Sequence, residues 1–312
     1  MNWKTILLAV FVSAALGFLL VTFGAHELGV YGWGVFVGVP FLMGFVCSWI
    51  LNYYTSHSLF MSICFAIVST VVLAVLLLGL PIEGLICIAM ALPIALPFVI
   101  LGAVIARYLL ERKNRQYSPS LFAACLALVP LTIVGEYTAK PEPPITSVTT
   151  SVVIEAPVST VWKNVLSFPA LASPDDWLFQ TGIAYPESAV IVGSGVGATR
   201  YCRFSTGDFV EPITTWNENH LLAFDVSAQP PAMVELSPWN LSPHHLRENY
   251  MRSRRGQFRL IALNDRRTLL EGTTWYQDYF WPQPYWHAWS NFIVHRIHNR
   301  VLQHIKLLSE RK

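Results

Sequence analysis

The residue best suited to chemistry in this chain is a carboxylate inside an expected strand. In the run GDFVEPITTW side chains alternate between two faces, so Phe209, Glu211 and Ile213 share one face. If that face is buried, the Glu211 carboxylate needs a partner, which Arg200 or Arg203 on the preceding strand can supply. Two interpretations stay open. Glu211 orients a ligand or transfers protons, which makes it the best catalytic candidate, or it belongs to a structural ion pair or an exposed edge.

The positions of the histidines and cysteines are weaker indications of a functional site than Glu211. His295 and His298 lie three residues apart, a spacing at which two imidazoles can share a metal ion. No carboxylate or third histidine is placed to complete such a site, so we predict surface positions or helix–sheet packing for them, no metal centre and no cofactor. Cys202 lies inside a strand, where packing is also expected. We find no Cys-x-x-Cys or Cys/His zinc spacing and assemble no Ser-His-Asp or Cys-His arrangement.

The elements that position these residues divide the chain into two parts of different composition. Between residues 1 and 106 the only Asp, Glu, Lys and Arg residues are Lys4, Glu27 and Glu83. Such depletion is typical of helices in a lipid bilayer, where a charge at the centre costs ~3 kcal/mol or more. Glu27 and Glu83 fall in expected loops, so no charge within a span indicates a transport pathway. We predict five spans, at Thr5–Gly24, Val30–Leu51, Ser58–Leu80, Gly84–Ala106 and, shorter and holding Pro130, Ser118–Gly135.

The orientation of the spans follows the excess of Lys and Arg in cytoplasmic loops. Lys4 precedes the first span, and Arg107, Arg112, Lys113 and Arg115 lie between the fourth and fifth, so both basic sites can be cytoplasmic. If the fifth segment crosses, the rest of the chain emerges on the opposite face, which for a bacterial inner membrane is the periplasm. If it is re-entrant, the rest is cytoplasmic. We expect a multi-pass membrane protein with a periplasmic soluble domain.

A proline-rich spacer separates the membrane part, residues 1–135, from a soluble part, residues 148–312. The spacer holds the run AKPEPPI, and we assign residues 136–147 to it. The soluble part predicts one strand, short helices, about six antiparallel strands with an irregular stretch at 230–253, and a long amphipathic helix from about Tyr285 to Glu310. This order indicates an α+β domain, and a curved sheet around one helix leaves an apolar cavity between them. The residues expected to bind a ligand there are Arg200, Phe209, Glu211, Phe224, Trp275, Trp289 and Ile293.

Several segments of the soluble part resemble the START-like superfamily, also called SRPBCC or the Bet v 1-like helix-grip fold. They are VVIEAPVSTVWKNVLSFP (152–169), GVGATRYCRF (195–204), GDFVEPITTW (207–216), RRGQFRLIAL (254–263) and RTLLEGTTWY (267–276). Within the superfamily the chain is most similar to the polyketide cyclase/dehydrase and lipid-transport group. The resemblance covers about Thr149 to Lys312 and nothing of the membrane part. It implies an antiparallel sheet wrapped round the terminal helix and a ligand such as a lipid, sterol or polyketide.

Three functions are consistent with this organisation. A membrane-anchored binding protein for a lipid or another hydrophobic small molecule is favoured over an enzyme. A cyclase/dehydrase-like enzyme is the first alternative, and a membrane sensor or scaffold is the second. The formal net charge of +2 gives no reason to expect a nucleic acid partner.

Overall fold

In the computed structural model the chain forms two compact units, which are described separately. The structure describes residues 3–53, 55–111 and 118–311. Unit 1 comprises Met1–Glu142, Glu235–Arg247 and Phe280–Pro282, and unit 2 comprises Pro143–Val234, Glu248–Tyr279 and Gln283–Lys312. Two short segments from the second half of the sequence therefore belong to the unit that holds the N-terminal helices.

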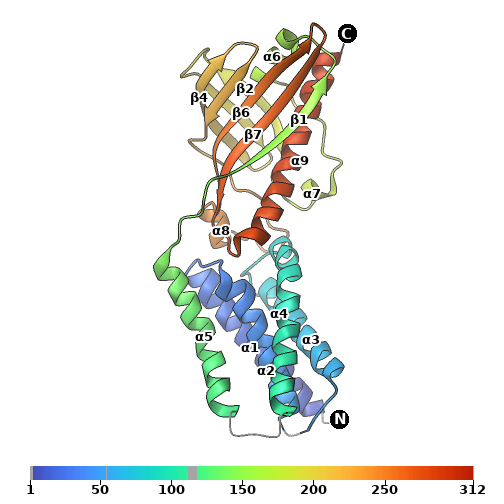
Figure 1. The fold of residues 1–312 in the computed structure, drawn as a ribbon, viewed down its shortest axis with the longest axis vertical. Coiled ribbons are helices and arrows are strands. Elements are labelled where there is room, and N and C mark those ends of the chain that lie inside the picture. The colour runs from blue at the N-terminus through green and yellow to red at the C-terminus, as the bar shows by residue number, and fades with distance from the viewer. Residues whose placement is uncertain (1–2, 54, 112–117, 312) are drawn as a thin grey trace. The chain divides into compact units, whose positions relative to one another are not determined.

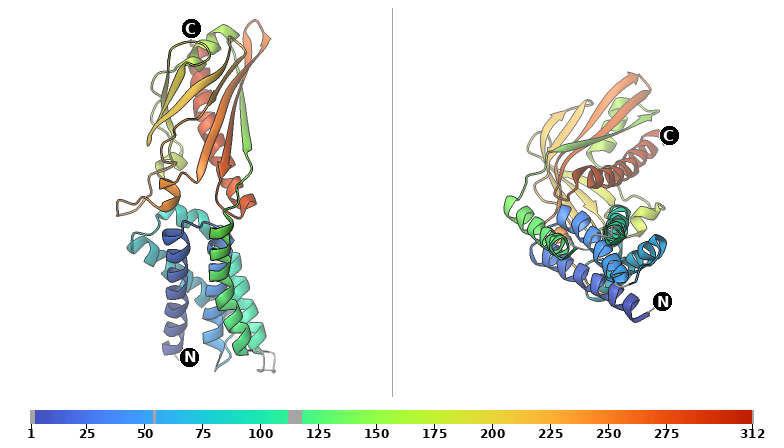
Figure 2. Two further views of the ribbon diagram at one scale, coloured as in Figure 1. Left: turned by 90° about the vertical axis from the view of Figure 1, so that its left-hand side faces the viewer. Right: turned by 60° about the horizontal axis from the view of Figure 1, so that its bottom comes forward.

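Unit 1 is a bundle of long apolar helices that run side by side (Figures 1 and 2). Its helical segments are α1 (Trp3–Val21) with the π-helix η1 (Thr22–Glu27), the π-helix η2 (Gly34–Gly38) with α2 (Val39–Asn52), α3 (Leu59–Gly79), α4 (Leu85–Glu111), α5 (Ser118–Ala139) and the short α8 (His244–Arg247). Within the described residues, five helices are long and apolar enough to cross a membrane, as the sequence predicts. Phe11, Val75 and Leu131 are among the large apolar side chains exposed on these helices, an arrangement that suits a lipid solvent.

The sequence leaves open whether the fifth apolar segment crosses the membrane. In the structure this segment is one continuous helix, α5. It has 22 residues, and at 1.5 Å per residue its length is about 33 Å, which suffices for a hydrocarbon core of about 30 Å. Pro130 lies inside it without ending it. The Glu136 carboxylate accepts hydrogen bonds from the backbone N–H groups of Trp33 and Gly34, at 2.6 and 3.1 Å, and so satisfies amides at the start of η2. The helix continues to Ala139. The irregular spacer between α5 and β1 consequently covers residues 140–145 and is shorter than expected.

Helices α2 and α4 approach each other through two glycines. A Cβ atom at Gly44 would lie 1.9 Å from the carbonyl oxygen of Val99, and one at Gly102 would lie 2.0 Å from that of Phe41. Close contact between small residues is how helices associate in lipid, where burial of apolar surface offers little driving force. The two positions therefore fix how near α2 and α4 can come.

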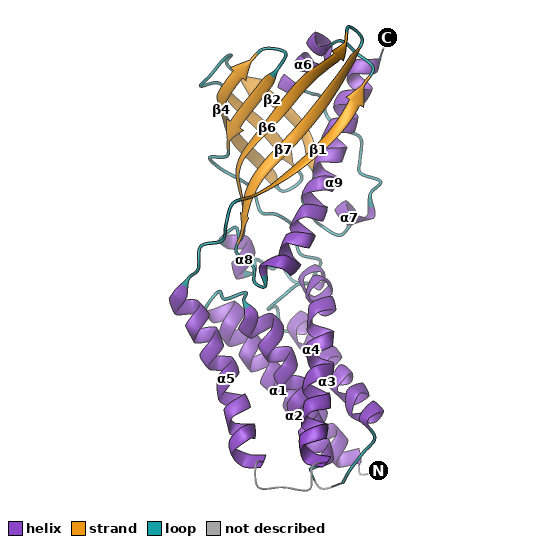
Figure 3. Ribbon diagram, viewed as in Figure 1, coloured by secondary structure: helices purple, strands orange, loops and turns teal. Residues whose placement is uncertain are grey.

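Unit 2 is a curled antiparallel sheet with one long helix against its concave face (Figure 3). Its strands are β1 (Thr146–Ile154), β2 (Pro186–Val192), β3 (Thr199–Phe204), β4 (Gly207–Asn217), β5 (Leu221–Asp225), β6 (Met251–Asn264) and β7 (Arg267–Asp278), and its helices are α6 (Val158–Leu166), α7 (Trp177–Gln180) and α9 (Gln283–Glu310). In the described residues the seven strands lie in the order β1-β7-β6-β5-β4-β3-β2. This is the helix-grip architecture that the sequence resemblance implied.

The core of unit 2 forms where alternating residues of the sheet meet the apolar face of α9. Leu222 of β5 and Leu270 of β7 pack with Leu302 and Ile305 of α9, and Trp162 of α6 joins them. All five side chains are buried. The period of two along the strands and of about 3.6 along the helix, both visible in the sequence, produce this contact.

One strand differs from its prediction. β6 begins at Met251, inside the stretch 230–253 that was expected to be irregular. Arg252, Ser253 and Arg254 are all polar, so the alternation that indicates a strand is missing there. The register with β7 also shifts between Ser253 and Arg255. This part of β6 has no alternating hydrophobic pattern, and its backbone pairing with β7 is what makes it a strand.

A leucine in place of Gly44 should force α2 and α4 apart, because its side chain would overlap the backbone of α4. Overpacking of this kind costs about 1–3 kcal/mol. We expect Gly44→Leu to lower the melting temperature of the detergent-solubilised protein, followed by tryptophan fluorescence. Gly135→Leu is the control, since a Cβ atom at Gly135 meets no atom within 4 Å. Equal loss of stability in the two variants would contradict this packing.

Candidate functional site

Unit 2 contains a cavity of about 140 Å³ between the concave face of the sheet and α9. Its walls are largely apolar, with Phe204, Phe209, Phe224 and Phe258 from the sheet and Ile293, Ile297 and Val301 from the helix. Polar side chains face it at two main places. One is the pair formed by Arg200 and Glu211, and the other is His298 with Thr274.

The first polar place is a buried ion pair. Arg200 of β3 and Glu211 of β4 are direct partners in the strand register, and the guanidinium Nη1 donates to Glu211 Oε2. Both residues are more than nine-tenths buried. The Arg200 Nε atom has no hydrogen-bond partner among the described residues. One donor of a charged group therefore remains free beside the cavity.

Aromatic rings surround this guanidinium. Its central carbon lies 5.4 to 5.7 Å from the ring centroids of Phe168, Phe224 and Phe258, within the range of cation–π attraction. Burial by itself lowers the pKa of Arg200, but the Glu211 carboxylate and Cys202 together more than offset this effect, so the pKa lies above its usual value. Arg200 is therefore charged in the folded domain.

Cys202 follows Arg200 on the same face of β3 and also lines the cavity. Burial raises the pKa of the Cys202 thiol to about 12, although Arg200 opposes this effect. A thiol with such a pKa carries almost no thiolate near neutral pH, and the thiolate is the nucleophilic form. The packing role that the sequence predicted for Cys202 fits this environment.

The second polar place is centred on His298. Its Nε2 atom lies 2.8 Å from the Thr274 hydroxyl, and its Nδ1 atom lies 3.1 Å from the Thr150 hydroxyl, which also contacts His295 Nδ1 at 2.7 Å. Burial, and then the nearby His295, lower the pKa of His298 to about 4. The imidazole is thus neutral near pH 7, and the two histidines share a threonine hydroxyl.

The structure brings together five of the seven residues predicted to bind a ligand. Arg200, Phe209, Glu211, Phe224 and Ile293 all line the cavity. Arg200, and not Arg203, is the partner of Glu211, because Arg203 points to the other face of β3 and pairs with the exposed Asp208.

The other two predicted residues, Trp275 and Trp289, are not among those that line the cavity. On β7 the neighbouring Thr274 faces α9, so alternation turns Trp275 to the outer face, where it lies under the Arg255 guanidinium. Trp289 lies one helical turn before Ile293 and packs edge-on against Phe292, beyond the end of the cavity.

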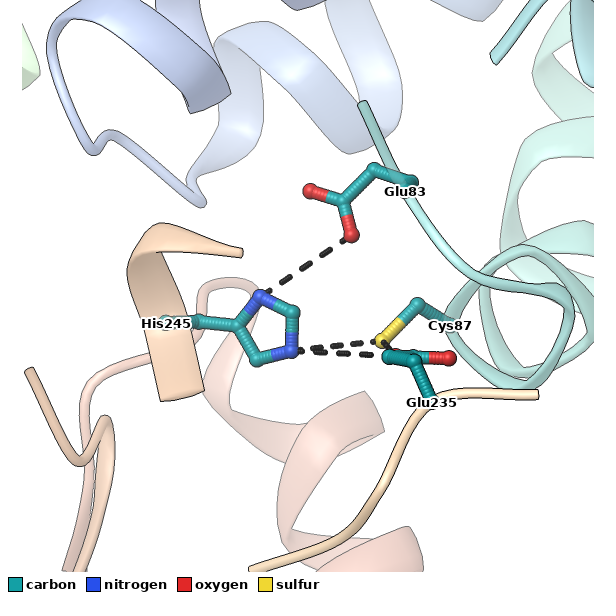
Figure 4. A group of neighbouring side chains, drawn as sticks. All are labelled: Glu83, Cys87, Glu235 and His245. Carbon is teal, nitrogen blue, oxygen red and sulfur yellow. Dashed lines mark hydrogen bonds and ion pairs between the residues drawn. The ribbon is translucent and has the colours of Figure 1, made fainter. Parts of the chain in front are cut away.

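A second group of reactive side chains lies within unit 1 (Figure 4). Glu83, Cys87, Glu235 and His245 each offer one metal-ligating atom, and these atoms lie within 4.8 Å of one another. The Cys87 thiol donates to Glu235 Oε1, and its Sγ atom lies 3.3 Å from His245 Nε2. On the other side of the ring, His245 Nδ1 lies 3.9 Å from Glu83 Oε2.

Burial changes the pKa values of the groups in this cluster. Burial raises the pKa of Glu83 to about 8, with a hydrogen bond from Tyr31 opposing the rise and Glu235 adding to it. The Tyr31 hydroxyl donates to Glu83 Oε1 at 2.7 Å. Burial also raises the pKa of Glu235 and lowers that of His245 to about 3. Each shift disfavours the charged form of its group, as expected for burial without an opposite charge.

Sequence reasoning did not predict this cluster. Glu83 was expected in a loop, and it does precede α4, but it is buried. Glu83 and Cys87 lie four positions apart, one just before α4 and one in its first turn, in a segment almost free of charge. Two reactive residues so close together in an apolar segment are the signal that the sequence offers for this cluster. Their partners Glu235 and His245 come from a segment about 150 residues later, for which the sequence offers no pairing rule.

Substitutions of Arg200 and Glu211 test whether the two residues form a buried ion pair. Arg200→Met leaves the Glu211 carboxylate buried without a partner, so we expect a loss of about 3–5 kcal/mol of stability. In the double variant Arg200→Met, Glu211→Met the loss should be smaller, since no charge remains. Arg203→Met, which breaks the exposed pair, should cost less than about 1 kcal/mol. Denaturant unfolding of the detergent-solubilised chain measures all three, and equal losses for Arg200→Met and Arg203→Met would contradict the buried pair.

Comparisons with known proteins bear on the fold alone. No family model matches the chain, and no curated protein matches it. Among solved structures, truncated norcoclaurine synthase from Thalictrum flavum is 13% identical, with 55% of this chain and 98% of that chain covered and a TM-score of 0.35. Zhui aromatase/cyclase from a Streptomyces species is 14% identical, with 54% and 95% covered and a TM-score of 0.34. A protein from Nitrosospira multiformis is 17% identical, with 53% and 96% covered and a TM-score of 0.32. Similarity at this level does not indicate what the chain binds.

Proposed function

We propose that unit 2 binds a small hydrophobic molecule in its cavity and that Arg200 orients a polar atom of that molecule. The observation that carries this proposal is the free Nε donor of Arg200, buried beside a largely apolar cavity. A buried donor without a partner costs about 1–3 kcal/mol. A carbonyl or hydroxyl oxygen on a ligand would remove that cost, while its apolar part would contact the phenylalanine rings.

The size of the cavity narrows the ligand class. A volume of about 140 Å³ is close to that of an engineered cavity of about 150 Å³ in another protein that binds benzene. The cavity therefore fits one ring or a short branched chain. A whole lipid or polyketide exceeds this volume, so we favour a ring-sized molecule or the end of a larger one.

An enzyme is the second candidate, because a polar pair does lie inside the cavity. Glu211 is the one carboxylate among the described residues that line it. Burial raises the pKa of the Glu211 carboxyl, and its contact with Arg200, which stabilises the charged form, opposes that rise. If the domain is a cyclase/dehydrase-like enzyme, Glu211→Gln should abolish turnover and leave ligand binding in place.

Membrane anchoring completes the proposal. The five apolar helices supply the anchor, and an odd number of crossings puts Ala139 and the residues after it on the face opposite Lys4. Arg107 lies at the Lys4 end of the bundle by the same count, and the predicted basic residues Arg112, Lys113 and Arg115 lie outside the described residues. In a bacterial inner membrane, unit 2 would then be periplasmic.

Filling the cavity tests the binding proposal. A Cβ atom at Gly272 would meet only ordinary contacts, with Leu302 at 3.6 Å and Phe258 at 3.7 Å, so the side chain of Gly272→Leu should enter the cavity. We expect at least a tenfold lower amount of bound small molecule, measured by solvent extraction of the purified chain and mass spectrometry. Glu271→Leu adds the same side chain on the outer face of β7 and should retain the ligand. Unchanged occupancy in Gly272→Leu would rule out this cavity.

A reporter fusion tests the orientation. Alkaline phosphatase, which is active only after export, is fused after Lys312 or, as a control, after Glu111. If α5 crosses, the fusion at Lys312 should be active and the one at Glu111 inactive, and green fluorescent protein at the same sites should give the reverse pattern. Phosphatase activity at Glu111 and none at Lys312 would invert the proposed orientation.

A further inference from the structure

We propose that Cys87, Glu235 and His245 bind one divalent transition-metal ion of the zinc class in unit 1, and that Glu83 orients His245 for this role. The site lies outside the cavity of unit 2 and does not depend on the function proposed for that unit. It draws on the start of α4, the segment that begins at Glu235, and α8.

The ligand atoms converge as a metal site requires. Cys87 Sγ is 3.3 Å from His245 Nε2, and Glu235 Oε1 is 4.0 Å from the same nitrogen. Around tetrahedral zinc, with bonds of about 2.0–2.3 Å, ligand atoms lie roughly 3.3–3.8 Å apart. The Cys87 Sγ and Glu235 Oε1 atoms lie 2.6 Å apart, so these two would have to separate by about 0.9 Å for the three atoms to share one ion. Three protein ligands leave a fourth position for water or another small ligand.

Several polar atoms of the cluster are buried and lack hydrogen bonds. Glu83 Oε2, Glu235 Oε2 and His245 Nδ1 have no hydrogen-bond partner among the described residues. The side chain of Glu235 is fully buried and that of His245 is 3% exposed. In the described part of the chain no Lys or Arg forms an ion pair with either glutamate. A bound cation would supply the missing positive charge at this place.

The chemistry of the donors selects the metal. A thiolate and an imidazole together suit zinc and its neighbours in the first transition row, whereas magnesium and calcium prefer oxygen ligands. Glu83 lies on the far side of the imidazole from Cys87, facing Nδ1 (Figure 4). On closer approach than the present 3.9 Å, this carboxylate would accept a hydrogen bond from Nδ1–H and fix the tautomer in which Nε2 faces the metal. Tyr31 in turn holds Glu83.

Backbone contacts hold the ligand-bearing segments together. The Leu85 N–H donates to the Leu236 carbonyl at 3.1 Å, and the Trp239 indole N–H donates to the Leu78 carbonyl at 3.1 Å. At Gly84 a Cβ atom would lie 1.9 Å from Glu235 Oε2. Only glycine therefore allows the carboxylate to lie this close to Cys87. The positions of the ligands are set by the fold of unit 1 and not by the side chains alone.

A cysteine nucleophile activated by His245 is the competing interpretation. Catalytic thiolates form in positively charged surroundings, but the Cys87 thiol contacts the Glu235 carboxyl group, and no Lys or Arg pairs with Glu235 in the described residues. A neighbouring carboxylate disfavours a thiolate unless a cation is present. The same arrangement thus argues against a metal-free nucleophile and for a metal ligand.

Metal content of the purified full-length chain tests this inference. After incubation with zinc and removal of excess metal, plasma mass spectrometry should find one zinc per chain. Cys87→Ser and His245→Ala should each reduce this at least tenfold, while Cys64→Ser, which removes a thiol elsewhere in the bundle, should leave it unchanged. Glu83→Gln should weaken binding about 10–100-fold without abolishing it, as expected for a residue that acts through a ligand.

Cobalt substitution provides a readout that does not depend on the folding of variants. Cobalt bound by Cys87 should give a thiolate-to-cobalt charge-transfer band in the intact chain, and zinc should displace it. No zinc in the intact chain, or a cobalt spectrum without a thiolate band, would overturn the proposal. Undiminished zinc in Cys87→Ser and His245→Ala would do so too, and a complete loss in Glu83→Gln would refute the orienting role.

Discussion

Taking an ionised side chain out of water costs several kcal/mol unless an opposite charge or hydrogen bonds replace its lost hydration. Both polar clusters of this chain are shaped by that constraint. In unit 2 the guanidinium of Arg200 and the carboxylate of Glu211 satisfy each other. In unit 1 the carboxylates of Glu83 and Glu235 face a thiol and an imidazole, neither of which provides a permanent positive charge. The first cluster is nearly neutral because its two charges cancel, whereas in the second burial favours the uncharged forms of Glu83, Glu235 and His245.

The same constraint explains why the cavity of unit 2 persists. A well-packed core would fill the space between the sheet and α9 with side chains. Arg200 and Glu211 fill part of that space as a buried ion pair, and His298 enters from the helix with two threonine partners. Phenylalanine rings close around these polar groups and leave room between them. The cavity is thus a consequence of placing polar side chains inside a small curved sheet.

Much of the fold could be predicted from local patterns. Charge depletion indicated the five apolar helices, and alternation located most strands and the inward face of β4, including Glu211. Arg200 and Arg203 are an odd number of positions apart and so point to opposite faces of β3. Which of them meets Glu211 depends on the register of β3 on β4, which the sequence does not show. Trp275 was misplaced for the same reason, since nothing local said which face of β7 turns to α9. The cluster around Cys87 could not be predicted, because it joins residues separated by about 150 positions.

The division of the sequence between the two units has a consequence for biosynthesis. Residues Glu235–Arg247 and Phe280–Pro282 belong to unit 1 although they are interleaved with the strands of unit 2. Translation proceeds at about 5–20 residues per second, so Glu235 emerges roughly 7–30 s after Cys87. During that interval the helices at the N-terminal end hold an unfinished cluster, which later residues complete. Neither unit can therefore be produced as one uninterrupted stretch of sequence, and a gene truncated after the last apolar helix would encode a bundle that lacks two of its four reactive side chains.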